Sequence, residues 1–168
     1  MARLQSILAW RLAPAFCVAG AGLLALAPVS AQALSDGDKA LLDDVSDAHK
    51  LCFAATEDDA VNASMFLTRG WTVLDDDNAG RQILKHSATD VLVRLRSDDV
   101  RACIVIAFTD NPATERAYMD FFPDVEWREI ESGGYIAPAP GRTIGVNHTA
   151  GNSPRLTVQT IIRAGATE

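Results

Sequence analysis

Three histidines and one run of three aspartates are the side chains best suited to acid–base or metal chemistry in this chain of 168 residues. The histidines are His49, His86 and His148, and the aspartates are residues 75–77. Helical zinc sites place two histidines four residues apart, and no pair here has that spacing. A hydrolase or metal-dependent enzyme would therefore need the fold to bring His49, His86 or His148 close to carboxylates from distant segments.

The acidic run does not match a calcium-binding loop. An EF-hand loop needs oxygen ligands at positions 1, 3 and 5, glycine at position 6 and glutamate at position 12. With Gly80 at position 6, Ala79 and His86 occupy two of the ligand positions. The sequence also lacks the nucleophile elbow, the P-loop and the dinucleotide-binding glycine pattern. We predict a polar turn here, and we assign no catalytic, cofactor-binding or metal residue.

Two cysteines, Cys52 and Cys103, lie beyond the first 33 residues. An even pair of cysteines in an exported protein usually forms a disulfide. Cys52 falls on an apolar helical stripe, and Cys103 falls in an apolar run typical of a buried strand. The alternative is a catalytic or redox thiol, but no basic cluster adjoins either cysteine to stabilise a thiolate. We therefore predict a structural bridge between a helix and the sheet.

The N-terminal segment has the features of a cleaved secretory signal peptide. Two arginines precede an apolar stretch at residues 12–27, and small residues follow it, with cleavage predicted after Ala33 or after Ala31. A membrane anchor is less consistent with this short stretch, since a spanning helix needs about 20 apolar residues. A lipid-modified Cys17 is the third option, but this cysteine lies inside the apolar stretch. We predict a periplasmic or extracellular protein with no membrane span after processing.

The charge of the chain disfavours whole classes of partner. The formal net charge is −7, and loss of Arg3 and Arg11 with the signal peptide makes it more negative. Most nucleic-acid affinity comes from neutralising phosphates with basic residues, so no nucleic-acid partner is expected. Anionic membrane surfaces are disfavoured for the same reason. Acidic residues are concentrated in residues 34–77, which we interpret as a solvated helical face, with a basic partner as the alternative.

Residues 34–168 have the length and pattern of one α+β domain. Helices are expected at residues 36–55, 60–69 and 111–122, with Gly70 ending the second in a left-handed conformation. Apolar and alternating segments predict strands at residues 71–74, 82–86, 90–96, 100–109, 127–131, 143–148 and 156–163. Residues 138–141 are expected to form a stiff loop. Short turns favour a mostly antiparallel sheet with helices packed on one face.

Two aromatic residues are candidate partner contacts. Trp127 sits in a charged stretch, and Tyr135 lies in a segment rich in glycine and proline, residues 133–142. Exposed aromatic residues are common interface anchors, and a loop of this composition suits recognition. The alternative is that both residues pack in the core or in a plain connector.

No known family is recognised in these patterns. We therefore favour a secreted or periplasmic, non-enzymatic binding or accessory protein, with an unidentified protein or small molecule as its partner and its oligomeric state left open. The alternatives are the enzyme described above and a structural protein of the cell envelope. Two histidines and a carboxylate meeting in a pocket would favour the enzyme, whereas a large exposed apolar patch would favour the envelope protein.

Overall fold

The computed structural model describes residues 33–57 and 61–163. The predicted signal peptide ends at Ala31 or Ala33, so it lies outside the described residues apart from its last position. In the part of the chain that is described, no helix is long and apolar enough to cross a membrane. The described residues form three helices: α1 (Asp36–Ala55), α2 (Ser64–Leu67) and α3 (Ala113–Asp120).

Helix α1 has the bounds that the sequence predicts. Its start is fixed by a capping box, in which the Ser35 hydroxyl accepts from the Asp38 amide and the Asp38 carboxylate accepts from the Ser35 amide. The same carboxylate accepts a hydrogen bond of 3.0 Å from the Asn111 side chain, beside the start of α3. These hydrogen bonds, that of Asn111 first, lower the pKa of Asp38. Asp38 thus ties two helix starts together.

Replacing Asp38 with alanine is expected to lower the free energy of unfolding by about 1–2 kcal/mol, because the capping box and the Asn111 contact are both lost. The matched control is Asp36→Ala in the same helical turn, whose side chain makes only an exposed ion pair with Lys39. That control should cost less than about 0.5 kcal/mol. Urea unfolding of both variants measures the difference, and equal losses would contradict the role assigned to Asp38.

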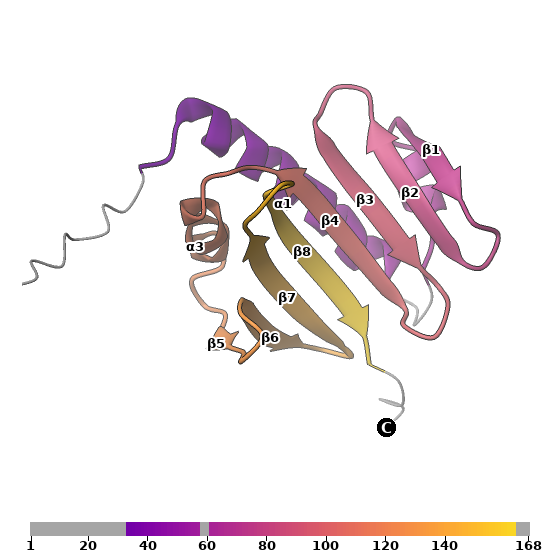
Figure 1. Ribbon diagram of the computed structural model, residues 1–168. Coiled ribbons are helices and arrows are strands. Elements are labelled where there is room, and N and C mark those ends of the chain that lie inside the picture. Colours follow the sequence, from indigo (N-terminus) through magenta and orange to yellow (C-terminus); the bar gives the residue numbers. More distant parts are fainter. Residues whose placement is uncertain (1–32, 58–60, 164–168) are drawn as a thin grey trace, which may run out of the picture. The chain divides into compact units, whose positions relative to one another are not determined.

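The eight strands found between residues 61 and 163 form one antiparallel sheet in the order β1-β2-β3-β4-β8-β7-β6-β5. The first four are consecutive hairpins, and so are the last four, with α3 between the two sets (Figure 1). Strands β4 and β8 join the two sets at the centre. The bounds are β1 (Trp71–Asp76), β2 (Arg81–His86), β3 (Val91–Arg96), β4 (Ala102–Phe108), β5 (Arg128–Glu129), β6 (Tyr135–Ala139), β7 (Arg142–Thr149) and β8 (Arg155–Ile162).

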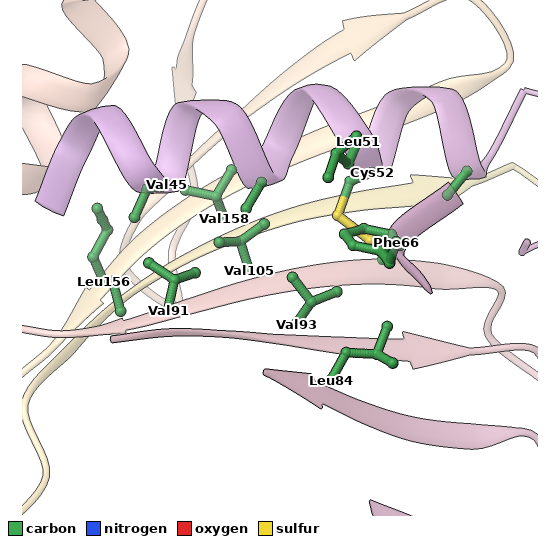
Figure 2. Packing of buried hydrophobic residues seen from close by; sticks show 14 of the residues in the cluster. Val45, Leu51, Cys52, Phe66, Leu84, Val91, Val93, Val105, Leu156 and Val158 are labelled. Carbon is green, nitrogen blue, oxygen red and sulfur yellow. A yellow bond between two sulfur atoms is a disulfide. The ribbon is translucent and has the colours of Figure 1, made fainter. Parts of the chain in front are cut away.

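The helices pack on one face of this sheet, which confirms the predicted α+β class. Figure 1 shows α1 passing behind the central strands. Tyr118 of α3 hydrogen-bonds to His49 of α1, so α3 lies on the same side. The core fills the space between (Figure 2). One row of core residues crosses five neighbouring strands in register: Leu84, Val93, Val105, Val158 and Val146.

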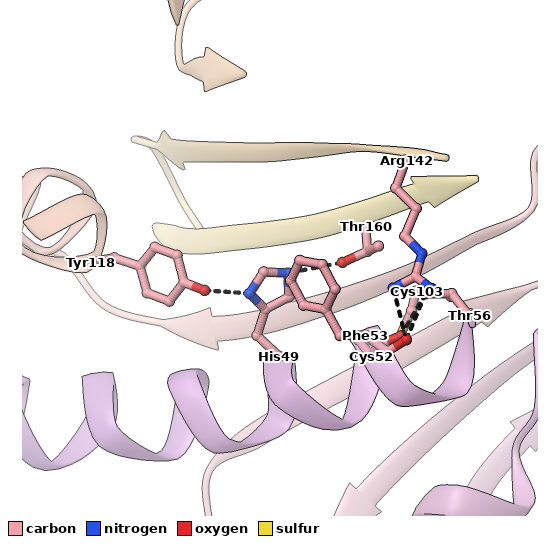
Figure 3. The surroundings of a disulfide bond; sticks show 8 residues. All are labelled: His49, Cys52, Phe53, Thr56, Cys103, Tyr118, Arg142 and Thr160. Atoms are coloured by element: carbon pink, nitrogen blue, oxygen red, sulfur yellow. Dashed lines mark hydrogen bonds between the residues drawn. A yellow bond between two sulfur atoms is a disulfide. The ribbon is translucent and has the colours of Figure 1, made fainter. Parts of the chain in front are cut away.

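The disulfide between Cys52 and Cys103 is present, as the sequence predicts. It joins α1 to β4 across 51 residues of chain, with the two Cα atoms 5.4 Å apart (Figure 3). Both cysteines are fully buried. The bridge therefore fixes the main helix to the central strand of the sheet.

Two predicted segments are wrong. The second helix spans only Ser64–Leu67, because the Asn62 side chain accepts from the Ser64 amide and forms a turn instead of a longer helix; residues 58–60 lie outside the description. Of residues 138–141, the first two belong to β6, where Pro138 pairs with Thr143, and only Pro140 and Gly141 form the connecting turn to β7. Proline is tolerated there because β5 pairs with only the first two residues of β6, which leaves Pro138 on a free edge.

Candidate functional site

The face of the sheet turned away from α1 is not covered by any described helix, and we call it the open face. It follows from simple alternation along each strand. In β3, Val91, Val93 and Leu95 are buried beneath the helices, while Leu92, Arg94 and Arg96 point the other way. The sequence predicts this alternation in β3. Which residues of the neighbouring strands share the open face follows only from the register of the sheet.

Apolar side chains from four strands gather near the middle of the open face. In register, Arg94 lies between Ile83 of β2 and Ile104 of β4. Phe108, at the end of β4, is 54% exposed. Five further apolar side chains of the open face are only partly buried: Ile83, Leu92, Ile104, Ile106 and Ile161.

This arrangement corrects the interpretation of β4 as a strand buried on both faces. Cys103, Val105 and Ala107 are buried beneath α1, but Ile104 and Ile106 are only partly covered. Isoleucines at these positions on a central strand form a half-exposed apolar surface instead of a second core. The open face is therefore able to bury further apolar area in a complex.

Positive charge surrounds these apolar side chains. According to the register of the sheet, the strand residues of the open face include one acid, Asp75, and six cations: Arg81, Lys85, Arg94, Arg96, Arg128 and Arg155. The acidic residues of α1 lie on the opposite side of the domain, at positions 36, 38, 43, 44 and 47. A chain that is acidic overall thus has one basic face. Opposite charges on a partner would be attracted to it.

A surface hollow of about 390 Å³ lies on the open face above β1, β2 and β3. Three arginines line it, and two of them are fixed by Asp98 at distances of 2.6 Å for Arg81 and 3.0 Å for Arg96. The hydrogen bonds from Arg96 and then Arg81 hold the pKa of Asp98 far below its usual range. Arg94 makes no hydrogen bond or ion pair within the described ranges, so it is the guanidinium left free for a partner.

The predicted polar turn begins later than expected, because Asp75 and Asp76 are the last two residues of β1 and only residues 77–80 form the turn of the β1–β2 hairpin. The Asp76 carboxylate accepts hydrogen bonds from Gln82 and from the Asn78 amide, and these lower its pKa. The Asp77 carboxylate accepts from the Ala79 and Arg81 amides. These hydrogen bonds hold the turn in place. Within residues 33–57 and 61–163, no three histidine, cysteine or acidic side chains are grouped for metal binding.

The three histidines occupy separate environments. Strands β3, β4 and β8 separate His86 on β2 from His148 on β7, which places their backbones roughly 19 Å apart at the spacing of a sheet. His148 is half-buried and hydrogen-bonds to the Thr109 carbonyl. No two of the histidines meet a carboxylate in one pocket in the described structure.

His49 of α1 is buried where this helix meets α3 and β8 (Figure 3). Its Nε2 lies 2.8 Å from the Thr160 hydroxyl, and its Nδ1 hydrogen-bonds to the Tyr118 hydroxyl. Burial lowers the pKa of His49 to about 4 and raises that of Tyr118. The imidazole is therefore neutral near pH 7 and joins three elements by hydrogen bonds.

The two candidate aromatic contacts, Trp127 and Tyr135, are both half-buried. Each packs against the hydrophobic core, Trp127 just before β5 and Tyr135 at the start of β6. The Trp127 indole nitrogen is buried without a hydrogen-bond partner. The segment proposed as a recognition loop, residues 133–142, is strand β6 with a turn at each end.

The residues of the open face that sequence reasoning missed are Ile104, Ile106 and Phe108. The polar residues of the flanking strands indicate that this side of β4 is not a second core, because Arg94 and Gln159 lie on either side of Ile104 in register. Comparison of the chain with protein-family models, with curated proteins and with solved structures finds no match. Inference about function therefore depends on the surfaces described above.

Proposed function

We propose that this chain is a secreted or periplasmic binding protein, without enzymatic activity, whose open face docks an acidic protein. One observation carries the proposal: the open face presents apolar side chains of β2, β3, β4 and β8 among cations, while the helices pack on the other face. Apolar contact supplies affinity, and complementary charge selects the partner and speeds association.

Export is supported by two independent features of the chain. The first 33 residues have the basic start, short apolar stretch and small-residue end of a signal peptide. The Cys52–Cys103 disulfide is a bond that persists in oxidising compartments and is rare in the cytosol. Export with cleavage after Ala33 or Ala31 also removes two positive charges, which leaves the open face as the main basic surface.

The interleaving of charge favours a protein partner over burial in a structural layer of the envelope. Arg94 lies between Ile83 and Ile104, and Lys85 is next to Leu92 in register. Leu92 and Ile106 adjoin in register, but Arg94 and Lys85 interrupt the apolar side chains on β2 and β3, unlike the uninterrupted apolar patches that mark permanent burial. Carboxylates of a partner would meet Arg94 and Lys85 while its apolar side chains cover the isoleucines.

The experiment places a photo-crosslinking amino acid at one position per variant in the full chain, expressed in its native envelope. Thr157 lies in register with Ile106 on the open face, and Leu67 is exposed on the helical side. We expect an adduct from position 157 and none of the same mass from position 67. Mass spectrometry of the crosslinked species identifies the partner, which should be acidic, and shows whether the mature chain begins near residue 34.

The partner is then purified and its affinity measured with two charge variants. Arg94→Glu should weaken binding at least tenfold, whereas Arg116→Glu on α3, which changes net charge equally, should leave it unchanged. Affinity should also fall as salt is added. The docking proposal fails if adducts form equally from both positions, if position 157 gives none, or if the two arginine variants behave alike.

A further inference from the structure

A second concave site lies on the opposite side of the sheet, between α1 and the turn that joins β2 to β3. Its volume is about 560 Å³, within the range of small-molecule pockets. Helix α1 forms one wall, and Trp71 and His86, from the paired ends of β1 and β2, form the other. The site shares no residue with the open face, so it is independent of the protein docking proposed above.

The inner wall of this pocket is apolar and aromatic. Ala48, Leu51 and Trp71 line it, and each is buried in the core. The His86 and Trp71 rings lie 5.6 Å apart between centroids and are tilted by 52°. Gly70 makes this arrangement possible, because a Cβ at that residue would lie 3.3 Å from His86 Nε2 and its φ is +82°.

Two residues that line the same pocket carry polar groups without partners. The carboxylate of Asp44 is half-buried and makes no hydrogen bond or ion pair within the described part of the chain. The Thr89 hydroxyl oxygen is buried and has no hydrogen-bond partner. His86 Nδ1 accepts from the Ala88 amide at 3.3 Å, which places the ring proton on Nε2 and leaves Nδ1 occupied. Unsatisfied buried polar groups are costly, and a ligand that bonds to them removes that cost.

The electrostatic surroundings of Asp44 favour a cation. Burial, followed by repulsion from Asp47 and Asp43, raises the pKa of Asp44. The nearest ammonium on the helix, that of Lys50, already pairs with Asp47 at 2.7 Å. The Coulombic influence of His86 acts in the opposite direction, but it is smaller than the effects of burial, Asp47 and Asp43. A positive charge beside Asp44 would therefore relieve the repulsion that remains.

We propose that this pocket binds a small organic ammonium ion with an apolar or aromatic body. The ammonium group pairs with the Asp44 carboxylate and donates to the Thr89 hydroxyl, and the body packs on Trp71, Leu51 and Ala48. A bare metal ion fits less well, because the described residues bring no three metal-binding side chains together and the inner wall is apolar. Lys50 and Arg69 also line the pocket, so it is the Asp44 carboxylate beside the apolar wall, and not the summed charge of the lining, that favours an amine.

The test titrates phenethylamine into protein made from the full chain, with ¹H–¹⁵N NMR as the readout. We expect saturable shifts of the Trp71 indole signal and of the Thr89 amide. Asp44→Asn should weaken binding roughly tenfold to a hundredfold, as expected for loss of a charged hydrogen bond. The uncharged analogue 2-phenylethanol should bind at least tenfold more weakly than the amine to the unmodified protein.

The matched control is Asp43→Asn, which removes one charge from the next residue of α1, an exposed aspartate outside the pocket. It should alter affinity less than threefold. Both variants should keep the NMR spectrum of the folded protein, since neither side chain makes a hydrogen bond or ion pair within the described residues. The proposal is overturned by an absence of saturable shifts, by equal binding of 2-phenylethanol, or by equal effects of Asp43→Asn and Asp44→Asn.

Discussion

Replacing Cys52 and Cys103 together with alanine is expected to lower the free energy of unfolding by about 4 kcal/mol. The bridge closes a loop across a separation of 51 residues, and the chain-entropy model gives roughly this value for a loop of that length. Both cysteines are fully buried beneath α1, so loss of their sulfur contacts adds to the entropic term. The net stability of a typical domain is only about 5–15 kcal/mol, so this loss would be a large fraction of it.

Urea unfolding under non-reducing conditions measures the effect, and the reductant supplies an internal control. Reduction should destabilise the unmodified protein by a similar amount, but it should leave the double variant unchanged because no bridge remains to break. The intact mass of the unmodified protein should be two hydrogens lower than that of its reduced, dithiol form. A loss below about 1 kcal/mol, or a variant that responds to reductant, would contradict the structural role of the bridge.

The bridge and its helix illustrate what a sequence pattern can predict. Leu41, Val45, Ala48 and Cys52 recur on one helical stripe, and Ser35 with Asp38 marks the start. Both signals are local, and each points to the same element, so the bounds of α1 agree with the prediction. The partner of Cys52 was predictable because only one other cysteine remains after the signal peptide.

Strand β6, next to the short edge strand β5, shows where local signals conflict. Pro138 and Pro140 with Gly141 resemble a loop, yet residues 135–139 pair with β7. A proline is compatible with a strand only where its missing amide faces no partner. That condition depends on the two-residue length of β5, which is a property of the tertiary fold and cannot be seen in the segment itself.

The open face could not be predicted from one strand at a time. The run from residue 102 to 108 is apolar at every position, which is typical of a strand buried on both sides. Only the register shows that Ile104 lies between Arg94 and Gln159, on a face with polar neighbours. The pocket beside Asp44 was equally hidden, because it joins α1 to a turn more than forty residues away.

The unmodified protein is expected to lose about 3 kcal/mol of stability between pH 7 and pH 4 through His49 alone. Burial lowers the pKa of His49 from 6.5 to about 4. A histidine with a lowered pKa stays neutral in the folded state while the unfolded chain takes up a proton. Its contribution is therefore fully present above pH 6.5 and is lost as the pH falls towards 4, at 1.36 kcal/mol for each pKa unit.

The hydrogen bonds of His49 explain why protonation opposes folding. The Tyr118 hydroxyl donates to Nδ1, because burial raises the pKa of Tyr118 and keeps its proton in place. The remaining ring proton is on Nε2, which donates to the Thr160 hydroxyl. A second proton on Nδ1 would displace the bond from Tyr118 and place an unpaired charge in the core, which is costly.

The measurement is urea unfolding of the unmodified protein and of His49→Leu at several pH values. The variant should be less stable at pH 7, because Tyr118 and Thr160 lose a partner, but its stability should depend less on pH. Glu115 titrates with the opposite sign, since burial raises its pKa, so the difference between the two proteins is the quantity to compare. His86→Gln is the control and should keep the full dependence. If His49→Leu keeps it as well, a different group is responsible, and the buried histidine does not control acid stability.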